Sequence, residues 1–264
     1  MRIPRASRLL IDANVEWNRA MGNMDTTLAE PKPMRLNGQV ADFDRDVVQQ
    51  LESFEGPWTT GQSPRWLSYG VKRALDLALS STLIVALFPL MILIGILIWI
   101  DCPGPAIYVS TRVGKHGRLF HFYKFRTMVP DADRHRNRLA EFNERDGILF
   151  KLSDDPRVTR IGKLLRKYSL DELPQLVNVL RGDMSLVGPR PSLASEVAHY
   201  KPEHLIRLWV LPGVTGLWQV ESRTNASFEN YIALDRAYVE NWNLWLDLQI
   251  LWRTVGAVVN GTGC

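Results

Sequence analysis

Residues 163–191 read K-L-L-R-K-Y-S-L-D-E-L-P-Q-L-V-N-V-L-R-G-D-M-S-L-V-G-P-R-P. An adjacent pair of acids, Asp171 and Glu172, lies here between a basic segment and a loop rich in glycine and proline. Ser169 stands three residues before Glu172, which is the spacing of a helix-capping box. Leucines and valines follow at helical spacing as far as Gly182, so this stretch predicts a helix that begins near the acid pair.

The acid pair has two readings. Acids in the first turn of a helix complement its macrodipole, so Asp171 and Glu172 are explained as a cap, and spacing alone favours this reading. A helix N-terminus also binds phosphate and keeps a neighbouring carboxylate ionised. Asp171 is then placed to attack a phosphoryl group, while Glu172 holds a divalent metal.

The loop after this helix, residues 182–191, favours the catalytic reading of the acid pair over the capping reading. Its glycines and prolines predict a rigid, sharply turned backbone. Arg190 lies between Pro189 and Pro191, which hold its backbone extended and reduce the entropy lost on binding an anion or a base. A structural connector is the alternative, although the composition is not that of a generic loop.

A basic amphipathic helix is expected before the acid pair, over residues 157–167. Asp155 is its expected N-cap and Pro156 its first residue. Arg166 is one of the cations that surround its apolar side. This pattern suits an anionic membrane surface, and a solvated surface helix is the alternative.

The segment from Leu77 to Ile100 contains no charged residue. A straight helix of this length spans about 36 Å, enough to cross a hydrocarbon core of about 30 Å. Pro89 should break it into arms of about 18 Å, each too short to cross. Both flanks are basic, so we expect a helix that enters and leaves on the cytoplasmic face. A simple spanning anchor with a tolerated proline is the alternative.

Residues 107–113 and 119–126 are rich in β-branched and aromatic residues and are separated by a Gly-Lys-His-Gly turn, which predicts a β-hairpin. Lys124 and Arg126 share one face of the second strand by its period of two. Two cations that project together can receive a phosphate. A solvated strand face explains them equally well.

The remaining segments carry weaker signals. Residues 1–66 read as a polar extension with two short amphipathic helices, within 8–24 and 43–54, and a linker at 56–64; residues 131–144 read as a charged helix. Helices are also expected over 228–241 and 242–259. Their tyrosines and tryptophans fit the lipid headgroup region or a protein core.

Composition restricts the partners without choosing one. The net charge of +4 and the pI of about 9.1 suit nucleic acid, a membrane surface or a phosphorylated substrate. Cys102 and Cys264 are too far apart in sequence to suggest a disulfide framework, and the five histidines form no zinc-ligand pattern. The N-terminus has no long apolar core, so no signal peptide is expected.

Three motifs in order, at 124–128 (K-F-R-T-M), 165–191 and 212–220 (P-G-V-T-G-L-W-Q-V), closely resemble those of the bacterial monotopic phosphoglycosyl transferases. The resemblance extends from about Lys72 to the C-terminus. Members of this family start surface polysaccharides on a polyprenyl phosphate. The chain most resembles those that prime exopolysaccharide with galactose 1-phosphate or glucose 1-phosphate.

The resemblance implies a ping-pong reaction. Asp171 would attack the β-phosphate of a UDP-hexose and release UMP, and the phosphosugar would then pass to undecaprenyl phosphate. Both acids would contribute to a Mg²⁺ site, with Glu172 also positioning phosphate. Further positions match the family's phosphate-binding and nucleotide-binding residues, namely Arg112, Lys124, Arg126, Arg166, Pro189, Arg190 and Pro191. Pro89 matches the break in the re-entrant helix, although Phe88 stands where relatives often carry serine.

The sequence as a whole therefore predicts an α+β, mostly helical, monotopic membrane enzyme. Its expected parts are an extension (1–66), a re-entrant helix (67–105) and a catalytic domain (106–264) at the cytoplasmic face of the inner membrane. UDP-hexose, undecaprenyl phosphate and membrane lipids are the expected partners, and nucleic acid is not. Homo-oligomerisation and the choice between galactose and glucose are left open. The alternatives are direct glycosyl transfer, which releases UDP, and a non-catalytic membrane scaffold.

Overall fold

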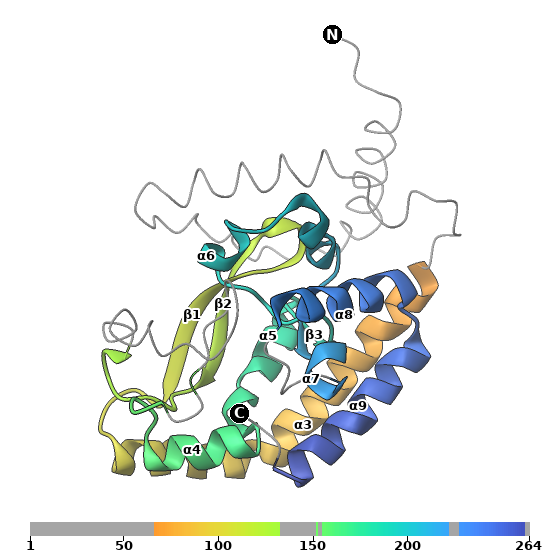
Figure 1. Cartoon of the computed structure of the whole chain (residues 1–264). Coiled ribbons are helices and arrows are strands. Elements are labelled where there is room, and N and C mark those ends of the chain that lie inside the picture. The colour runs from red at the N-terminus through yellow and green to blue at the C-terminus, as the bar shows by residue number, and fades with distance from the viewer. Residues whose placement is uncertain (1–65, 133–151, 153–154, 222–226, 262–264) are drawn as a thin grey trace, which may run out of the picture. The chain divides into compact units, whose positions relative to one another are not determined.

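The computed structural model describes residues 66–132, 152, 155–221 and 227–261, all within the compact unit Glu55–Cys264 (Figure 1). The helices and linker expected before residue 66 lie outside the described residues, and so does nearly all of the helix expected at 131–144. The described part is mostly helical and contains two small sheets, which confirms the coarse fold class.

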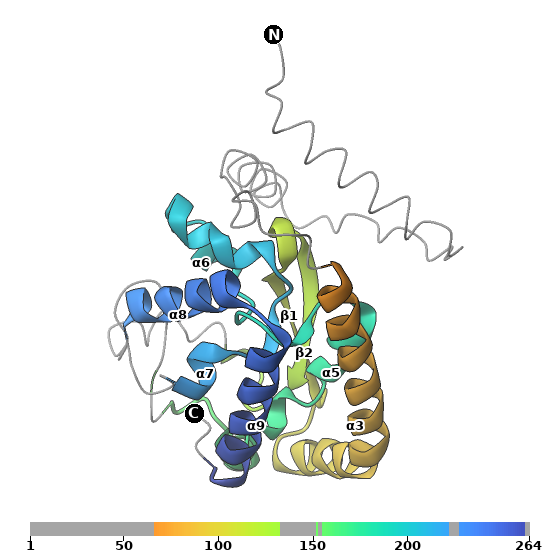
Figure 2. The ribbon, with the colours of Figure 1, turned by 90° about the vertical axis from the view of Figure 1, so that its right-hand side faces the viewer.

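Helix α3 (Trp66–Asp101) is a single helix of 36 residues with Pro89 inside it. Figures 1 and 2 show that its ribbon bends sharply, so that two arms point in different directions. A proline within a helix removes one backbone hydrogen bond and pushes against the preceding turn, which is a common cause of such a kink. The expected helix-break-helix is thus a bent helix that remains helical through the proline.

Among the described residues, α3 is the one helix long and apolar enough to cross a membrane by length and composition, and most of it is exposed. Before the proline, the Arg73 guanidinium donates to the Val179 carbonyl at 2.8 Å. After the proline, Ile94 and Ile98 pack into a core cluster with Leu165. Both arms are therefore attached to the segments that carry the acid pair.

Strands β1 (Ile107–Val113) and β2 (Leu119–Phe125) form an antiparallel hairpin closed by a 3₁₀ turn, η1 (Lys115–Gly117). The predicted hairpin is confirmed, and its second strand ends one residue earlier than expected. Tyr108 pairs with Lys124 across the hairpin. The hairpin therefore presents Lys124 from a regular strand.

Helix α4 (Arg160–Lys167) begins later than the sequence suggests. Thr159 is its N-cap, and the Thr159 side chain accepts a hydrogen bond from the Gly162 N–H at 3.0 Å. The expected cap, Asp155, is wrong, because its carboxylate is engaged by Arg157 in a buried ion pair at 2.6 Å. A side chain held in that pair does not cap a helix.

The expected capping box is also wrong. Ser169 adopts the left-handed conformation, with φ 54° and ψ 22°, and makes no side-chain capping bond. The acid pair lies in a separate 3₁₀ turn, η4 (Leu170–Glu172), and helix α5 (Gln175–Arg181) follows it after Pro174. The acids therefore precede α5 instead of forming its first turn.

Helix α5 ends at Gly182, which adopts the left-handed conformation with φ 86°, as the sequence predicts. Strand β3 (Ser185–Val187) follows and pairs in parallel with β4 (Gly213–Thr215). The sequence reading missed this two-stranded sheet, because three-residue strands leave no periodic pattern. A Cβ on Gly188 or Gly213 would strike the facing backbone, so both positions require glycine.

The C-terminal half is helical and begins immediately after the loop that follows β3. Its elements are α6 (Ala194–Val197), η5 (Pro202–Trp209), α7 (Leu217–Glu221), α8 (Phe228–Asn241) and α9 (Leu244–Val259). The predicted α8 has the observed bounds, and α9 begins two residues later than predicted.

The sequence left open whether the aromatic residues of these helices lie in the protein core or in the lipid headgroup region. In the structure some of them are buried and others are exposed. Tyr231, Tyr238 and Trp242 are buried in the protein, whereas Trp245 and Trp252 are 67% and 80% exposed. The exposed tryptophans lie on α9, whose outer side also carries exposed leucine and valine residues.

Candidate active site

Asp171 is the buried member of the acid pair, with 8% of its surface exposed, while Glu172 is half-buried. The Asp171 carboxylate accepts no hydrogen bond from the residues that the structure describes. Buried carboxylates usually have such partners, so this one is available to an incoming group. The 3₁₀ turn η4 and the core contact of Leu170 fix its position.

Two cations face Asp171 from different elements. The positive charges of Lys124, on β2, and of Arg166, on α4, both interact with the Asp171 carboxylate. Arg166 is held in place by a hydrogen bond from its Nε to the Thr127 hydroxyl oxygen at 2.9 Å. The hairpin and α4 therefore bring separate cations to the same carboxylate.

These cations repel one another and are partly withdrawn from water. Burial, together with the charges of Arg166, Arg190 and Arg112 and against the attraction of Asp171, lowers the pKa of Lys124 to about 8. Burial, followed by the charge of Arg190, lowers the pKa of Arg112 to about 10. A concentration of positive charge that the protein does not neutralise is the electrostatic signature of an anion site.

Arg126 is held by a different part of the protein. Its guanidinium donates to the carbonyl oxygens of Cys102 and Pro103, at the C-terminal end of α3. A cation at that end of a helix complements its dipole. Lys124 and Arg126 therefore have different partners, the Asp171 carboxylate for Lys124 and backbone carbonyls for Arg126.

The Pro-Arg-Pro loop (residues 188–191) is held by its backbone. Five carbonyls in and next to the loop accept hydrogen bonds from the surrounding protein: Val187, Pro189, Arg190, Pro191 and Ser192. Pro189 and Pro191 are buried, whereas the Arg190 side chain is exposed. The loop thus turns its carbonyls inward while the Arg190 charge stays close enough to affect Lys124 and Arg112.

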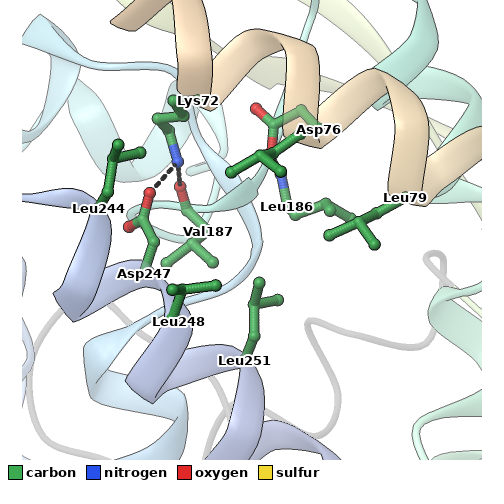
Figure 3. Close-up of a pocket in the computed structure, with 10 residues that line it drawn as sticks. Lys72, Asp76, Leu79, Leu186, Val187, Leu244, Asp247, Leu248 and Leu251 are labelled. Carbon is green, nitrogen blue, oxygen red and sulfur yellow. Dashed lines mark hydrogen bonds and ion pairs between the residues drawn. The ribbon is translucent and has the colours of Figure 1, made fainter. Parts of the chain in front are cut away.

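One group of loop contacts comes from α3 and α9. The Lys72 ammonium donates to the Val187 carbonyl at 3.0 Å and forms an ion pair with Asp247 at 2.6 Å (Figure 3). The Tyr238 hydroxyl lies within hydrogen-bond distance of the same two partners, 3.0 Å from the Val187 carbonyl oxygen and 2.9 Å from the Asp247 carboxylate. Asp76 accepts from the Leu186 N–H at 3.0 Å, so α3 holds the strand that leads into the loop.

These polar contacts border a small pocket between α3 and α9 (Figure 3). Most of the other residues that line it are leucines: Leu75, Leu79, Leu186, Leu244, Leu248 and Leu251. Sequence reasoning did not single out Lys72 or Asp247 as partners, because nothing local relates residues that are 175 positions apart.

A second group of contacts comes from η5 and α8, and sequence reasoning missed it too. Arg207 is 2% exposed and donates to the Arg190 carbonyl at 2.7 Å. It also forms an ion pair with Asp235 at 2.7 Å. An arginine inside the apolar run H-L-I-R-L-W is unusual and was the available signal of a buried charge.

The carboxylate oxygens of the acid pair are suitable ligands for a magnesium ion. Magnesium is commonly held by one or two carboxylates together with substrate phosphates. Among the described residues no three histidine, cysteine or acidic side chains form a metal cluster. Asp171 and Glu172 would therefore need oxygen atoms of a bound phosphate to complete the coordination.

A buried carboxylate that faces two cations, in a protein with a long apolar helix, is the arrangement expected of a site for phosphate-containing ligands. The chain belongs to the bacterial sugar transferase family, whose model matches residues 67–261. The match includes the bent helix, the hairpin, the acid pair and the Pro-Arg-Pro loop.

The names of similar proteins agree with this family assignment. An undecaprenyl-phosphate galactose phosphotransferase of Salmonella typhimurium is 44% identical over 73% of this chain and 41% of its own length. The exopolysaccharide production protein ExoY of Rhizobium meliloti is 40% identical over 73% of this chain and 87% of its own. A UDP-glucose:undecaprenyl-phosphate glucose-1-phosphate transferase of Caulobacter vibrioides is 40% identical over 71% of this chain and 69% of its own length. The chain spans about half or less of the length of several curated relatives.

Proposed function

We propose that this protein transfers a hexose 1-phosphate, from UDP-galactose or UDP-glucose, to undecaprenyl phosphate and so primes an exopolysaccharide or another surface glycan. The supporting observation is the Asp171 carboxylate, buried and without hydrogen bonds from the described residues, yet facing Lys124 and Arg166. The names of the relatives supply the substrate classes.

In the first step, an Asp171 oxygen attacks the β-phosphorus of the UDP-sugar. The bond between that phosphorus and the bridging oxygen breaks, and UMP leaves with the bridging oxygen and its electron pair. Lys124 and Arg166 stabilise the charge that develops on the phosphoryl oxygens. Arg190 and Arg112 hold the nucleotide phosphates, while Pro189 and Pro191 shape the loop beside them.

In the second step, an oxygen of undecaprenyl phosphate attacks the same phosphorus. The bond to Asp171 breaks, the carboxylate is regenerated, and the polyprenyl diphosphosugar leaves. The two steps use one nucleophile and one set of cations in turn, which is the pattern of a ping-pong reaction.

Asp171 and Glu172 would hold a magnesium ion together with substrate phosphate oxygens. When bound, that ion would offset the negative charge of the diphosphate, which the surrounding arginines and Lys124 do in part without it. Glu172 is half-buried next to the nucleophile, so its part in the proposal is to orient phosphate and metal.

We place α3 in the inner membrane as a re-entrant helix, with both ends on the cytoplasmic side. The bend and the interior Pro89 support this placement, and so do the basic residues on either side of the apolar run. In a cysteine-free background, single cysteines at Ser68 and Lys115 should both resist an impermeant reagent outside intact cells. Labelling of one flank alone would establish a spanning helix.

The reaction itself is tested with UDP-galactose and UDP-glucose that carry a labelled β-phosphate, using the full chain in nanodiscs with undecaprenyl phosphate and Mg²⁺. We expect UMP release and a covalent label on the wild type that is absent from Asp171→Asn. Glu240→Gln, an exposed acid on α8, is the matched control and should label normally.

Three results would overturn parts of this proposal. Release of UDP would establish direct glycosyl transfer. A covalent label that survives Asp171→Asn would assign the nucleophile elsewhere. Binding of UDP-sugar without any transfer would point to a non-catalytic membrane protein.

A further inference from the structure

Arg207 is a buried arginine, and a contribution to protein stability does not by itself explain why an arginine lies there. Withdrawing a guanidinium from water is costly, and an apolar side chain of similar volume often serves a core as well or better. Arg207 is nevertheless surrounded by groups that match its charge. Its guanidinium donates to the Tyr200 hydroxyl at 2.6 Å and to the Tyr231 hydroxyl, and it lies 2.7 Å from the Asp235 carboxylate.

Two aromatic rings fix the guanidinium further. Its central carbon lies 4.6 Å from the Tyr231 ring centre and 5.7 Å from that of Tyr200, both within range of a cation–π attraction. The planar fork of an arginine can contact a carboxylate, two hydroxyls and a carbonyl at once, which a lysine ammonium does less well. The site is therefore built for arginine.

The remaining contact of Arg207 is with the Arg190 carbonyl, at 2.7 Å. The Tyr231 hydroxyl reaches the same carbonyl at 3.5 Å. On either side, the Pro189 carbonyl accepts from the Gly213 N–H and the Pro191 carbonyl accepts from Arg112. Arg190 is thus held at its backbone from the interior, while its side chain is exposed and influences the cations of the site.

We propose that Arg207 is a positioning residue, which acts through the Arg190 carbonyl to hold the Arg190 guanidinium where the phosphates of the UDP-sugar bind. Asp235 and Tyr231 keep Arg207 in place. This inference rests on the proposed function, because it assumes that Arg190 binds the nucleotide phosphates. It assigns a part in substrate binding to a residue that does not touch substrate.

A double-mutant cycle tests the inference. Arg190→Ala, Arg207→Met and the double variant are compared with wild type for UDP affinity by calorimetry and for the KM of the UDP-hexose. We expect each single change to weaken UDP binding about 10-fold, the loss of one charge-assisted contact. The double variant should bind UDP no worse than Arg190→Ala, since the effect of Arg207 passes through Arg190.

Thermal stability separates positioning from folding. Arg207→Met should lower Tm by the same amount whether or not Arg190 is present, although its effect on UDP affinity disappears with Arg190. If the losses of UDP affinity multiply instead, Arg207 does not act through Arg190 and the inference fails.

Two gentler variants keep the test decisive if Arg207→Met does not fold. Tyr231→Phe removes one hydroxyl next to the Arg190 carbonyl, and Arg207→Lys keeps the charge without the fork. Both should fold and still raise the KM for UDP-hexose more than they lower kcat. Arg236→Met, which removes an exposed ion pair on the same helix as Tyr231, is the control and should change neither constant.

The proposed function can fail separately. If wild type binds UDP but transfers no phosphosugar, the assignment of the reaction is wrong, and the UDP-affinity cycle still decides the role of Arg207. If Arg190→Ala binds UDP as well as wild type, the inference about Arg207 is overturned, whether or not transfer is detected.

Discussion

Lys72, near the start of the long apolar helix α3, forms an ion pair at 2.6 Å with Asp247 of α9, although 175 positions separate them in sequence. The two side chains are 13% and 9% exposed. The Asp247 carboxylate also accepts hydrogen bonds from the Tyr238 hydroxyl at 2.9 Å and the Trp242 indole N–H at 3.1 Å. One carboxylate thus connects α3, α8 and α9 next to the strand that leads into the Pro-Arg-Pro loop.

Asp247→Ala should destabilise the protein by about 3 to 5 kcal/mol, because it leaves the Lys72 charge without its counter-ion and the Trp242 indole N–H without its acceptor. Thermal unfolding of the purified protein in detergent measures the change. Lys72→Met in the same background should recover part of the loss, since no unpaired charge then remains. Glu240→Ala, which breaks an exposed pair with Arg236, should cost less than about 1 kcal/mol. Equal losses from both changes would contradict a structural role for the Lys72–Asp247 pair.

Lys124 should impose an alkaline limit on substrate binding. Burial, with the repulsion of Arg166, Arg190 and Arg112 and against the attraction of Asp171, lowers its pKa to about 8. The side chain is therefore charged below that pH and neutral above it. If the ammonium binds phosphate, kcat/KM for the UDP-hexose should fall as pH rises through about 8.

Lys124→Arg is the control for this limit, because a guanidinium stays charged at that pH. The variant should lose some activity through changed geometry, but its profile should stay flat between about pH 7 and 9. If the alkaline limb has the same midpoint in Lys124→Arg, it belongs to another group.

Arg126 and Lys124 should differ sharply when each is replaced by methionine. Arg126 satisfies the carbonyls of Cys102 and Pro103 at the end of α3, so Arg126→Met should lower Tm and change the KM for UDP-hexose less than about threefold. Lys124→Met should raise that KM at least about 10-fold with a small change in Tm. Steady-state kinetics and thermal unfolding on both variants check this. A large KM effect in a stable Arg126→Met protein would return Arg126 to the phosphate site.

Local sequence patterns predicted the parts of this fold that local physics determines. The hairpin follows from β-branched strands around a glycine turn, and the end of α5 follows from Gly182. The acid pair and the loop arginine were found because their neighbours in sequence are informative. Four predicted positions, Arg112, Lys124, Arg166 and Arg190, are linked by their charges in the structure to one another or to Asp171.

One unpredicted feature is local: Asp155 was expected to cap α4, but Arg157 engages its carboxylate and Thr159 is the cap. The other unpredicted features depend on partners that are farther apart in sequence. The parallel pairing of β3 with β4 and the contact of Arg207 with the Arg190 carbonyl join distant segments. Neither leaves a periodic signal, because tertiary packing alone brings the partners together.

Gly162 in α4 and Gly256 in α9 provide a matched pair for the last prediction. A Cβ on Gly162 would strike the carbonyl oxygen of Thr127, whereas Gly256 has nothing within 4 Å of the same position. Gly162→Ala should therefore push α4 away from the end of the hairpin and destabilise the protein by about 1 to 3 kcal/mol. Because Arg166 is bonded to Thr127, the same shift should move a cation of the site and lower kcat/KM. Gly256→Ala should raise stability by up to about 1 kcal/mol through helix propensity alone and leave kinetics unchanged. Thermal unfolding and kinetics on the two proteins decide the matter, and a fully active, stable Gly162→Ala would show that close contact with Thr127 does not hold Arg166 in place.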